Sequence, residues 1–130
     1  MTPTELELFT KLQPQFKERI GNPQHGDACF LNGEADIYCE DCLENKVFSS
    51  KIYNDAIWLP RDIDRENPRR GLVGMIDNFM LLFKHYYSDS WGCKIDIEAE
   101  DKTINFDGAT PTEALLRALD YQWRQYDHGL

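Results

Sequence analysis

The sequence predicts an α+β fold, with a mainly antiparallel β-sheet and about three helices packed on it, an α/β sandwich. Three observations lead to this prediction. Two hairpin patterns lie in different parts of the chain, apolar residues recur at helical spacing in three other segments, and a capping motif opens the last of these. The 130 residues, 42% of them hydrophobic, suffice for one core, so we expect residues 1–130 to form a single globular domain.

The N-terminal segment is predicted to be a helix. Leu6, Phe9 and Phe16 lie at helical spacing and define one apolar face. Pro14 lacks an N–H and should break or kink the helix. We therefore expect a helix to about Gln13, with one more turn as the alternative.

The first hairpin is predicted from an Asn-Gly dipeptide that separates two apolar runs, residues 28–31 and 34–39. This dipeptide is the strongest short hairpin signal, because both of its residues accept the positive φ of a type I′ turn. A two-residue turn at this point pairs Cys29 with Asp36 across the ladder. Further short strands are expected over residues 46–48 and 56–59.

The middle of the chain is predicted to be a loop followed by a helix. Residues 60–70 are charged, contain two prolines and lack apolar periodicity, so they form the loop. Residues 71–87 carry large apolar side chains on one broad helical stripe. The loop also holds a basic cluster that we predict to dock a partner, because loops often carry recognition; its members are Arg61, Arg65, Arg69 and Arg70.

The C-terminal part is predicted to be a second hairpin and a final helix. Residues 91–98 and 103–106 alternate with period two, which is typical of strands with one buried face. Thr110, Pro111 and Glu113 then supply an N-cap, a proline at the first helical position and a glutamate at the third, which is a capping box.

The charge balance restricts the classes of partner. Lys and Arg total 14 against 23 Asp and Glu, so the formal net charge is -9 and the average surface repels phosphate. Nucleic acid is therefore not the expected partner. The start of the chain lacks the features of a signal peptide, and no apolar run approaches the ~18 residues of a membrane span. We expect a cytoplasmic protein without a membrane partner.

Three short motifs have a pattern in common with a known group of proteins. The first is Gly26 and Asp27 before a strand, the second is the Ile-Trp-Leu-Pro run at 57–60, and the third is Trp91 opening a hairpin that leads to the Ala-Thr-Pro-Thr-Glu-Ala-Leu run at 109–115. Together these motifs resemble those of small phage and prophage proteins described as phage ABA-sandwich domains. The resemblance implies helices on both faces of a short sheet and a phage-related context. It implies no catalytic residues, and the N-terminal helix and the segment 39–42 are additional to the pattern.

The four cysteines offer the most specific chemistry. Cys39 and Cys42 are spaced as two ligands of one zinc ion, and a closed structural site needs four. His25 and Cys93 complete the favoured quartet, because Cys29 should point to the opposite face of its hairpin. The alternative is that the thiols are reduced packing residues and that no cofactor is bound.

The function expected from the sequence is binding rather than catalysis. Asp96 and Glu98 alternate with isoleucines on a solvated face, and no Ser-His-Asp set or phosphate loop is present, so we do not expect an enzyme. We expect a small phage accessory protein that binds another macromolecule, most simply a protein. Two alternatives stay open: a zinc-stabilised binding module built on Cys39 and Cys42, and an acidic inhibitor that imitates nucleic acid and blocks a host enzyme.

Overall fold

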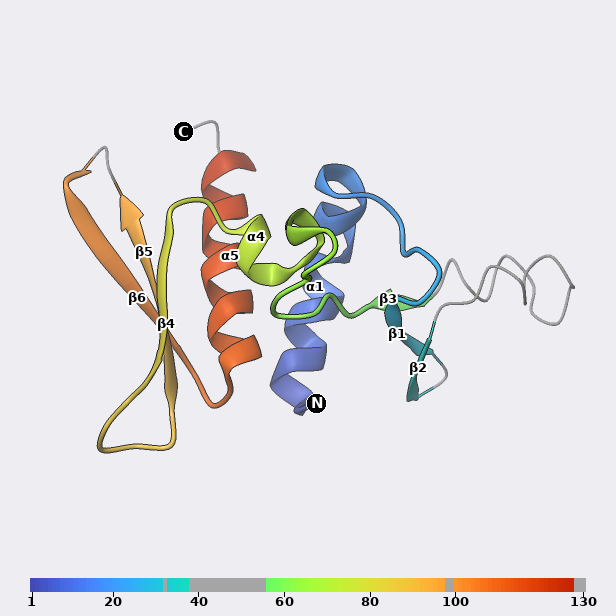
Figure 1. The fold of residues 1–130 in the computed structure, drawn as a ribbon, viewed down its shortest axis with the longest axis horizontal. Coiled ribbons are helices and arrows are strands. Elements are labelled where there is room, and N and C mark those ends of the chain that lie inside the picture. The colour runs from blue at the N-terminus through green and yellow to red at the C-terminus, as the bar shows by residue number, and fades with distance from the viewer. Residues whose placement is uncertain (32, 38–55, 98–99, 128–130) are drawn as a thin grey trace, which may run out of the picture. The chain divides into compact units, whose positions relative to one another are not determined.

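The computed structural model describes residues 1–31, 33–37, 56–97 and 100–127. The chain divides into two compact units, one made of Met1–Leu8 and Arg61–Leu130 and the other of Phe9–Pro60. Within the described residues there are three α-helices and two three-stranded antiparallel sheets, one sheet in each unit (Figure 1). The predicted α+β class is therefore confirmed, with the strands distributed over two small sheets.

Helix α1 spans Pro3–Arg19 and so continues past the proline that was expected to end it. Thr2 caps its first turn, because the Thr2 Oγ1 atom accepts the N–H of Glu5 at 3.1 Å. Pro14 lies on the exposed side of the helix, whereas Phe16, one turn beyond the expected end, is 1% exposed. The burial of this second half compensates for the one hydrogen bond that the proline cannot make.

The sheet of the Phe9–Pro60 unit contains β1 (Ala28–Leu31), β2 (Glu34–Ile37) and β3 (Ile57–Trp58) in the order β2-β1-β3. Gly33 has φ +85°, as a type I′ turn requires, and Cys29 pairs with Asp36 as predicted. The strand expected over residues 56–59 corresponds to β3. The one expected over residues 46–48, and the end of the one expected over 34–39, lie outside the described residues.

Two side chains of α1 hold β3 in this unit. The Trp58 N–H donates to Gln13 Oε1 and the Gln13 Nε2 group donates back to the Trp58 carbonyl, both at 2.9 Å. The Phe16 and Trp58 rings meet edge to face with centroids 5.5 Å apart. Together they anchor a strand of only two residues.

In the other unit, the prediction of one long helix over residues 71–87 is wrong. A 3-10 turn, η1 (Pro68–Arg70), and a four-residue helix, α4 (Leu72–Met75), are followed by the strand β4 (Phe79–Lys84). The helix ends at Met75, and the chain turns into β4 through Asn78, which has φ +57°. Large apolar side chains occupy almost every position of β4, so its sequence fits the apolar pattern of a helix and that of a strand equally well. Pairing with the next strand selects the strand.

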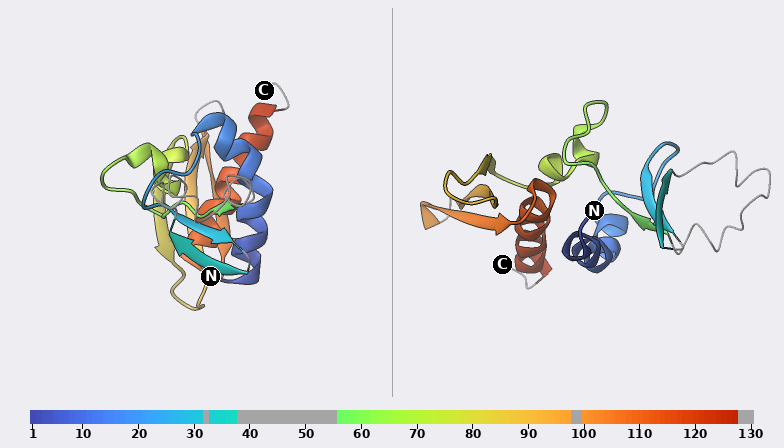
Figure 2. Two further views of the ribbon diagram at one scale, coloured as in Figure 1. Left: turned by 90° about the vertical axis from the view of Figure 1, so that its right-hand side faces the viewer. Right: turned by 90° about the horizontal axis from the view of Figure 1, so that it is seen from below.

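Strand β4 pairs with β5 (Trp91–Ile97), which pairs with β6 (Lys102–Gly108), all antiparallel, and the helix α5 (Pro111–Asp127) follows. The predicted second hairpin and final helix are therefore confirmed. Helix α5 lies along one face of this sheet, and no other described element of the same unit covers the opposite face (Figures 1 and 2). The core between sheet and helix is fully buried; it includes Cys93, Ile95, Leu115, Leu116 and Leu119.

Candidate functional site

The sheet β4-β5-β6 has a covered face and an open face. Phe106 contacts Tyr121 of α5, with ring centroids 5.2 Å apart, and it pairs across the sheet with Cys93, which pairs with Leu82. These residues therefore point toward α5, and their neighbours along each strand point away. The open face consists of Leu81 and Phe83 from β4, His85 directly after it, Gly92, Lys94 and Asp96 from β5, and Thr103, Asn105 and Asp107 from β6.

The ring of Phe83 lies over Gly92 on the open face. A Cβ atom built on Gly92 would lie 2.4 Å from the Phe83 Cζ atom, so the ring occupies the place that a side chain would take. The His85 ring contacts Phe83 edge to face, with centroids 5.1 Å apart. The glycine thus allows an aromatic platform to form across the strands.

His85 also connects the two edge strands. Its Nε2 atom lies 2.8 Å from Oδ1 of Asp107 on β6, while its backbone N–H donates to the Ser90 carbonyl at 3.0 Å and continues the β4-β5 ladder. The carboxylate is 66% exposed, so the pair contributes little to stability and mainly fixes the orientation of the imidazole ring. Within the described residues Asp107 makes no other side-chain hydrogen bond, so its Oδ2 atom can accept one.

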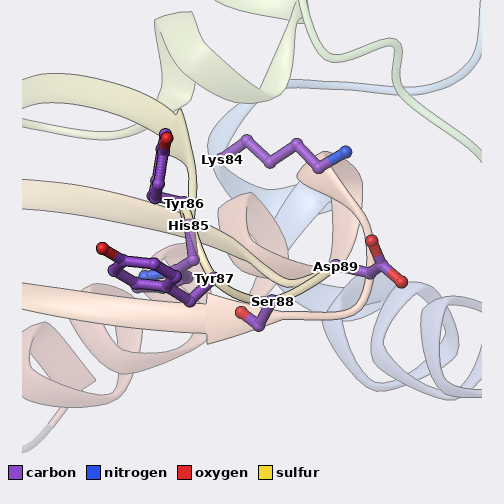
Figure 3. Close-up of a pocket in the computed structure, with 6 residues that line it drawn as sticks. All are labelled: Lys84, His85, Tyr86, Tyr87, Ser88 and Asp89. Atoms are coloured by element: carbon purple, nitrogen blue, oxygen red, sulfur yellow. The ribbon is translucent and has the colours of Figure 1, made fainter.

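Two exposed tyrosines extend this platform at the end of the hairpin. Tyr86 and Tyr87 are 90% and 96% exposed, and their rings meet edge to face at 4.7 Å. They project with His85 on one side of the turn, whereas Lys84 and Asp89 project on the other (Figure 3). A shallow, open hollow of about 580 Å³ is lined by Lys84, His85, Tyr86, Tyr87, Ser88 and Asp89. We call Phe83, His85, Tyr86 and Tyr87 the hairpin-end cluster.

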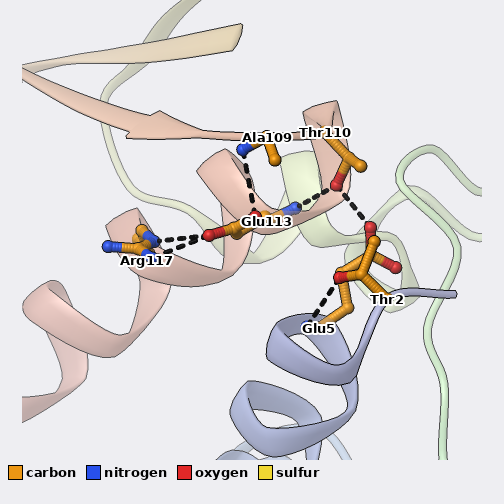
Figure 4. Close-up of polar contacts among 6 residues, drawn as sticks. All are labelled: Thr2, Glu5, Ala109, Thr110, Glu113 and Arg117. Atoms are coloured by element: carbon orange, nitrogen blue, oxygen red, sulfur yellow. Dashed lines mark hydrogen bonds and ion pairs between the residues drawn. The ribbon is translucent and has the colours of Figure 1, made fainter. Parts of the chain in front are cut away.

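A second polar group lies where α5 begins (Figure 4). Thr110 Oγ1 accepts the Glu113 N–H at 3.1 Å, and the Glu113 carboxylate accepts the Ala109 N–H at 3.0 Å and the Arg117 guanidinium at 2.7 Å. The Thr110 hydroxyl donates a short hydrogen bond to Glu5. This confirms the predicted capping box, with the carboxylate bound one residue upstream of the usual backbone N–H.

This second group supports the fold rather than a reaction. Glu5 and Glu113 are both buried and hydrogen-bonded, and no buried side-chain polar atom among the described residues lacks a partner. Nearby, Asp62 accepts the Thr112 hydroxyl at 2.7 Å. Burial raises the pKa of Asp62, the Thr112 hydrogen bond lowers it in part, and the negative charge of Glu5 raises it further.

The basic cluster predicted to dock a partner is divided by burial. Arg61, Arg65 and Arg69 are exposed, whereas Arg70 is 7% exposed at the end of η1. The Asp64 side chain orders the loop, since its Oδ1 atom accepts the successive backbone N–H groups of Glu66 and Asn67, both at 3.0 Å. Three of the four predicted residues therefore present their charges to solvent, and Arg70 does not.

The predicted zinc ligands are only partly described. Cys39 and Cys42 lie outside the described residues, and His25 is exposed in the turn before β1. Cys93 is 0% exposed in the core, and burial raises the pKa of its thiol to about 11. Among the described residues, no group of three or more His, Cys, Asp or Glu side chains is arranged to hold a metal ion. The zinc module stays a prediction.

No protein family, curated protein or solved structure matches this chain. None of the helices in the described ranges has both the length and the apolar character needed to cross a bilayer.

Sequence reasoning missed the hairpin-end cluster. Its residues were assigned to the end of the helix predicted over residues 71–87. One signal in the sequence favours a turn instead: a polar Ser-Asp-Ser run at 88–90 follows the two tyrosines. The apolar residues of 79–83 fit a helix and a strand equally and do not decide between them. The cross-strand partner Asp107 could be found only from the register.

Proposed function

We propose that this protein acts by binding another protein through the open face of the β4-β5-β6 sheet and its hairpin end, in the accessory role that the phage resemblance implies. The observation that carries the proposal is the concentration of exposed apolar and aromatic side chains there. Met80 and Leu81 on the edge strand are about half exposed, and Tyr86 and Tyr87 almost fully. Aromatic side chains exposed together are the usual anchors of protein interfaces.

The edge of the sheet supports the same proposal. The backbone of His85 bonds to β5, so by alternation Leu82 and Lys84 direct their backbone N–H and carbonyl groups away from it. No described strand pairs with this edge of β4. An extended segment of a partner can add there while its side chains contact the open face.

Site-specific crosslinking in the cells of origin tests the proposal. A benzophenone amino acid replacing Tyr87 should give one discrete adduct, whereas the same group at Lys102, exposed at the far end of the sheet, should not. The captured protein is then purified and its affinity measured. Truncation of Tyr86 and Tyr87 to alanine should weaken binding about 30-fold or more, as expected for two interface anchors.

Lys102→Ala serves as the matched control and should bind as the unaltered chain does. Equal affinity of the double-alanine variant and the unaltered chain for the captured protein would show that this surface is not the binding site.

A further inference from the structure

We infer that the hairpin-end cluster receives an arginine side chain presented by a basic segment of the partner. This inference rests on the proposed function, and it adds the chemical character of the partner. The Asp107 carboxylate lies beside this cluster, in contact with His85. Aromatic faces next to a carboxylate are the combination that binds a guanidinium group.

The aromatic part is open to a ligand. Neither tyrosine hydroxyl has a hydrogen-bond partner among the described residues, and both rings are almost fully exposed. Because the two ring planes are nearly perpendicular, at 86°, they form two walls of a corner. The His85 ring lies on the same side of the turn (Figure 3). A planar guanidinium group can stack on one wall while its stem contacts the other.

The acidic part is Asp107. One of its oxygens holds His85 at 2.8 Å and the other is available, so a bound guanidinium would receive both stacking and a charge-assisted hydrogen bond. Asp96 adds a second negative charge to the open face, against the single positive charge of Lys94. Lys84, although it lines the hollow, projects with Asp89 on the opposite side of the turn.

The charge of the whole chain favours the same ligand. With a net charge of -9, the protein attracts basic segments over a distance of about 10 Å and repels phosphate groups. A hydrated ammonium group stacks less well than a guanidinium group, so arginine fits the cluster better than lysine.

An NMR titration with a small probe tests this inference without the partner. We expect N-acetyl-arginine methylamide to shift the backbone amides of residues 83–90 and of Asp107, with a dissociation constant of about 1–10 mM for a fragment of this size. N-acetyl-citrulline methylamide has nearly the same shape without the charge and should bind at least about fivefold more weakly. Inorganic phosphate should not shift these residues.

Variants separate the two parts of the site. Changing both Tyr86 and Tyr87 to alanine should weaken binding of the arginine probe at least fivefold, and Asp107→Asn about threefold. Asp101→Asn removes the same charge at the opposite end of the sheet, where asparagine accepts the φ of +49°, and should bind the probe like the unaltered chain.

Equal shifts with the citrulline probe, shifts away from residues 83–90, or stronger shifts with phosphate would overturn the inference. Unchanged affinity of the double-alanine variant for the arginine probe would do the same. These outcomes are distinguishable from failure of the proposed function, because the crosslinked partner can still depend on the tyrosines when the arginine probe does not bind.

Discussion

Replacing Gly108 by alanine should destabilise this protein far more than replacing Gly92, although both are buried in the same sheet. A Cβ atom on Gly108 would lie 2.6 Å from the Ala114 backbone nitrogen and 3.0 Å from the Glu113 carbonyl carbon. Both atoms belong to the first turn of α5, which is held by its capping box. Ordinary contact begins at 3.4 Å, so helix and strand would have to separate by about 0.8 Å.

At Gly92 the obstacle is different. The atom that a Cβ would meet, at 2.4 Å, is the tip of the half-buried Phe83 ring, which can turn toward solvent. Part of the cost is offset because alanine loses less conformational entropy than glycine in a strand, by about 0.5–1 kcal/mol. The change in unfolding free energy should therefore stay within about 1 kcal/mol for Gly92→Ala, against about 3 kcal/mol of destabilisation for Gly108→Ala.

Thermal unfolding followed by circular dichroism measures the contrast. For a chain of this length, about 1 kcal/mol corresponds to roughly 3–4 °C, so Gly108→Ala should lower Tm by about 10 °C and Gly92→Ala should change it by at most about 4 °C. Because Gly92→Ala displaces Phe83 from His85, it should also weaken the arginine probe without unfolding the sheet. Equal Tm losses for the two variants would refute the reasoning about which neighbour can move.

Two further predictions follow from titratable groups. Because the pKa of Asp62 is raised in the folded state, its contribution to stability is fully present below the ordinary value of 3.8 and is lost as pH rises through the folded pKa. Asp62→Asn keeps an oxygen that accepts the Thr112 hydroxyl, and it should remove this pH dependence. Unfolding free energies of the two proteins measured across pH 3–7 test the prediction. If the two pH profiles run parallel, the cause assigned to the shift is wrong. Cys93, with its pKa at about 11, should be alkylated by iodoacetamide at pH 8 at least 100-fold more slowly in the folded chain than in denaturant, as peptide mass spectrometry can measure. Similar rates in both states would contradict its burial.

The elements that the sequence predicted well are those in which local chemistry and packing agree. The Asn-Gly hairpin, the alternating hairpin near the C-terminus and the capping box at Thr110 all have the expected form. In each case the residues that fix the backbone are adjacent in sequence, so no distant partner is needed to choose the structure.

The two errors arose where distant contacts decide. Pro14 does not end α1, because Phe16 beyond it is buried. The helical spacing of Phe16 indicated this face, but the prediction gave more weight to the proline. The run 79–84 is apolar at nearly every position, so both periods fit, and the ladder to β5 selects the strand. The assignment of this run to a helix also prevented prediction of the candidate site, because His85 and Asp107 become neighbours only when the three strands are in register.

The two faces of the C-terminal sheet are under different constraints, and this strengthens the case for binding. Side chains on the covered face are packed against α5 and determine stability. The hairpin-end cluster, by contrast, stabilises the fold little, since its tyrosines are almost fully exposed and the contact of His85 with Asp107 is solvated. An exposed aromatic pair adds a risk of aggregation without adding a core contact. Such side chains are most simply explained by a partner that covers them, which is why their removal should cost affinity and leave Tm almost unchanged.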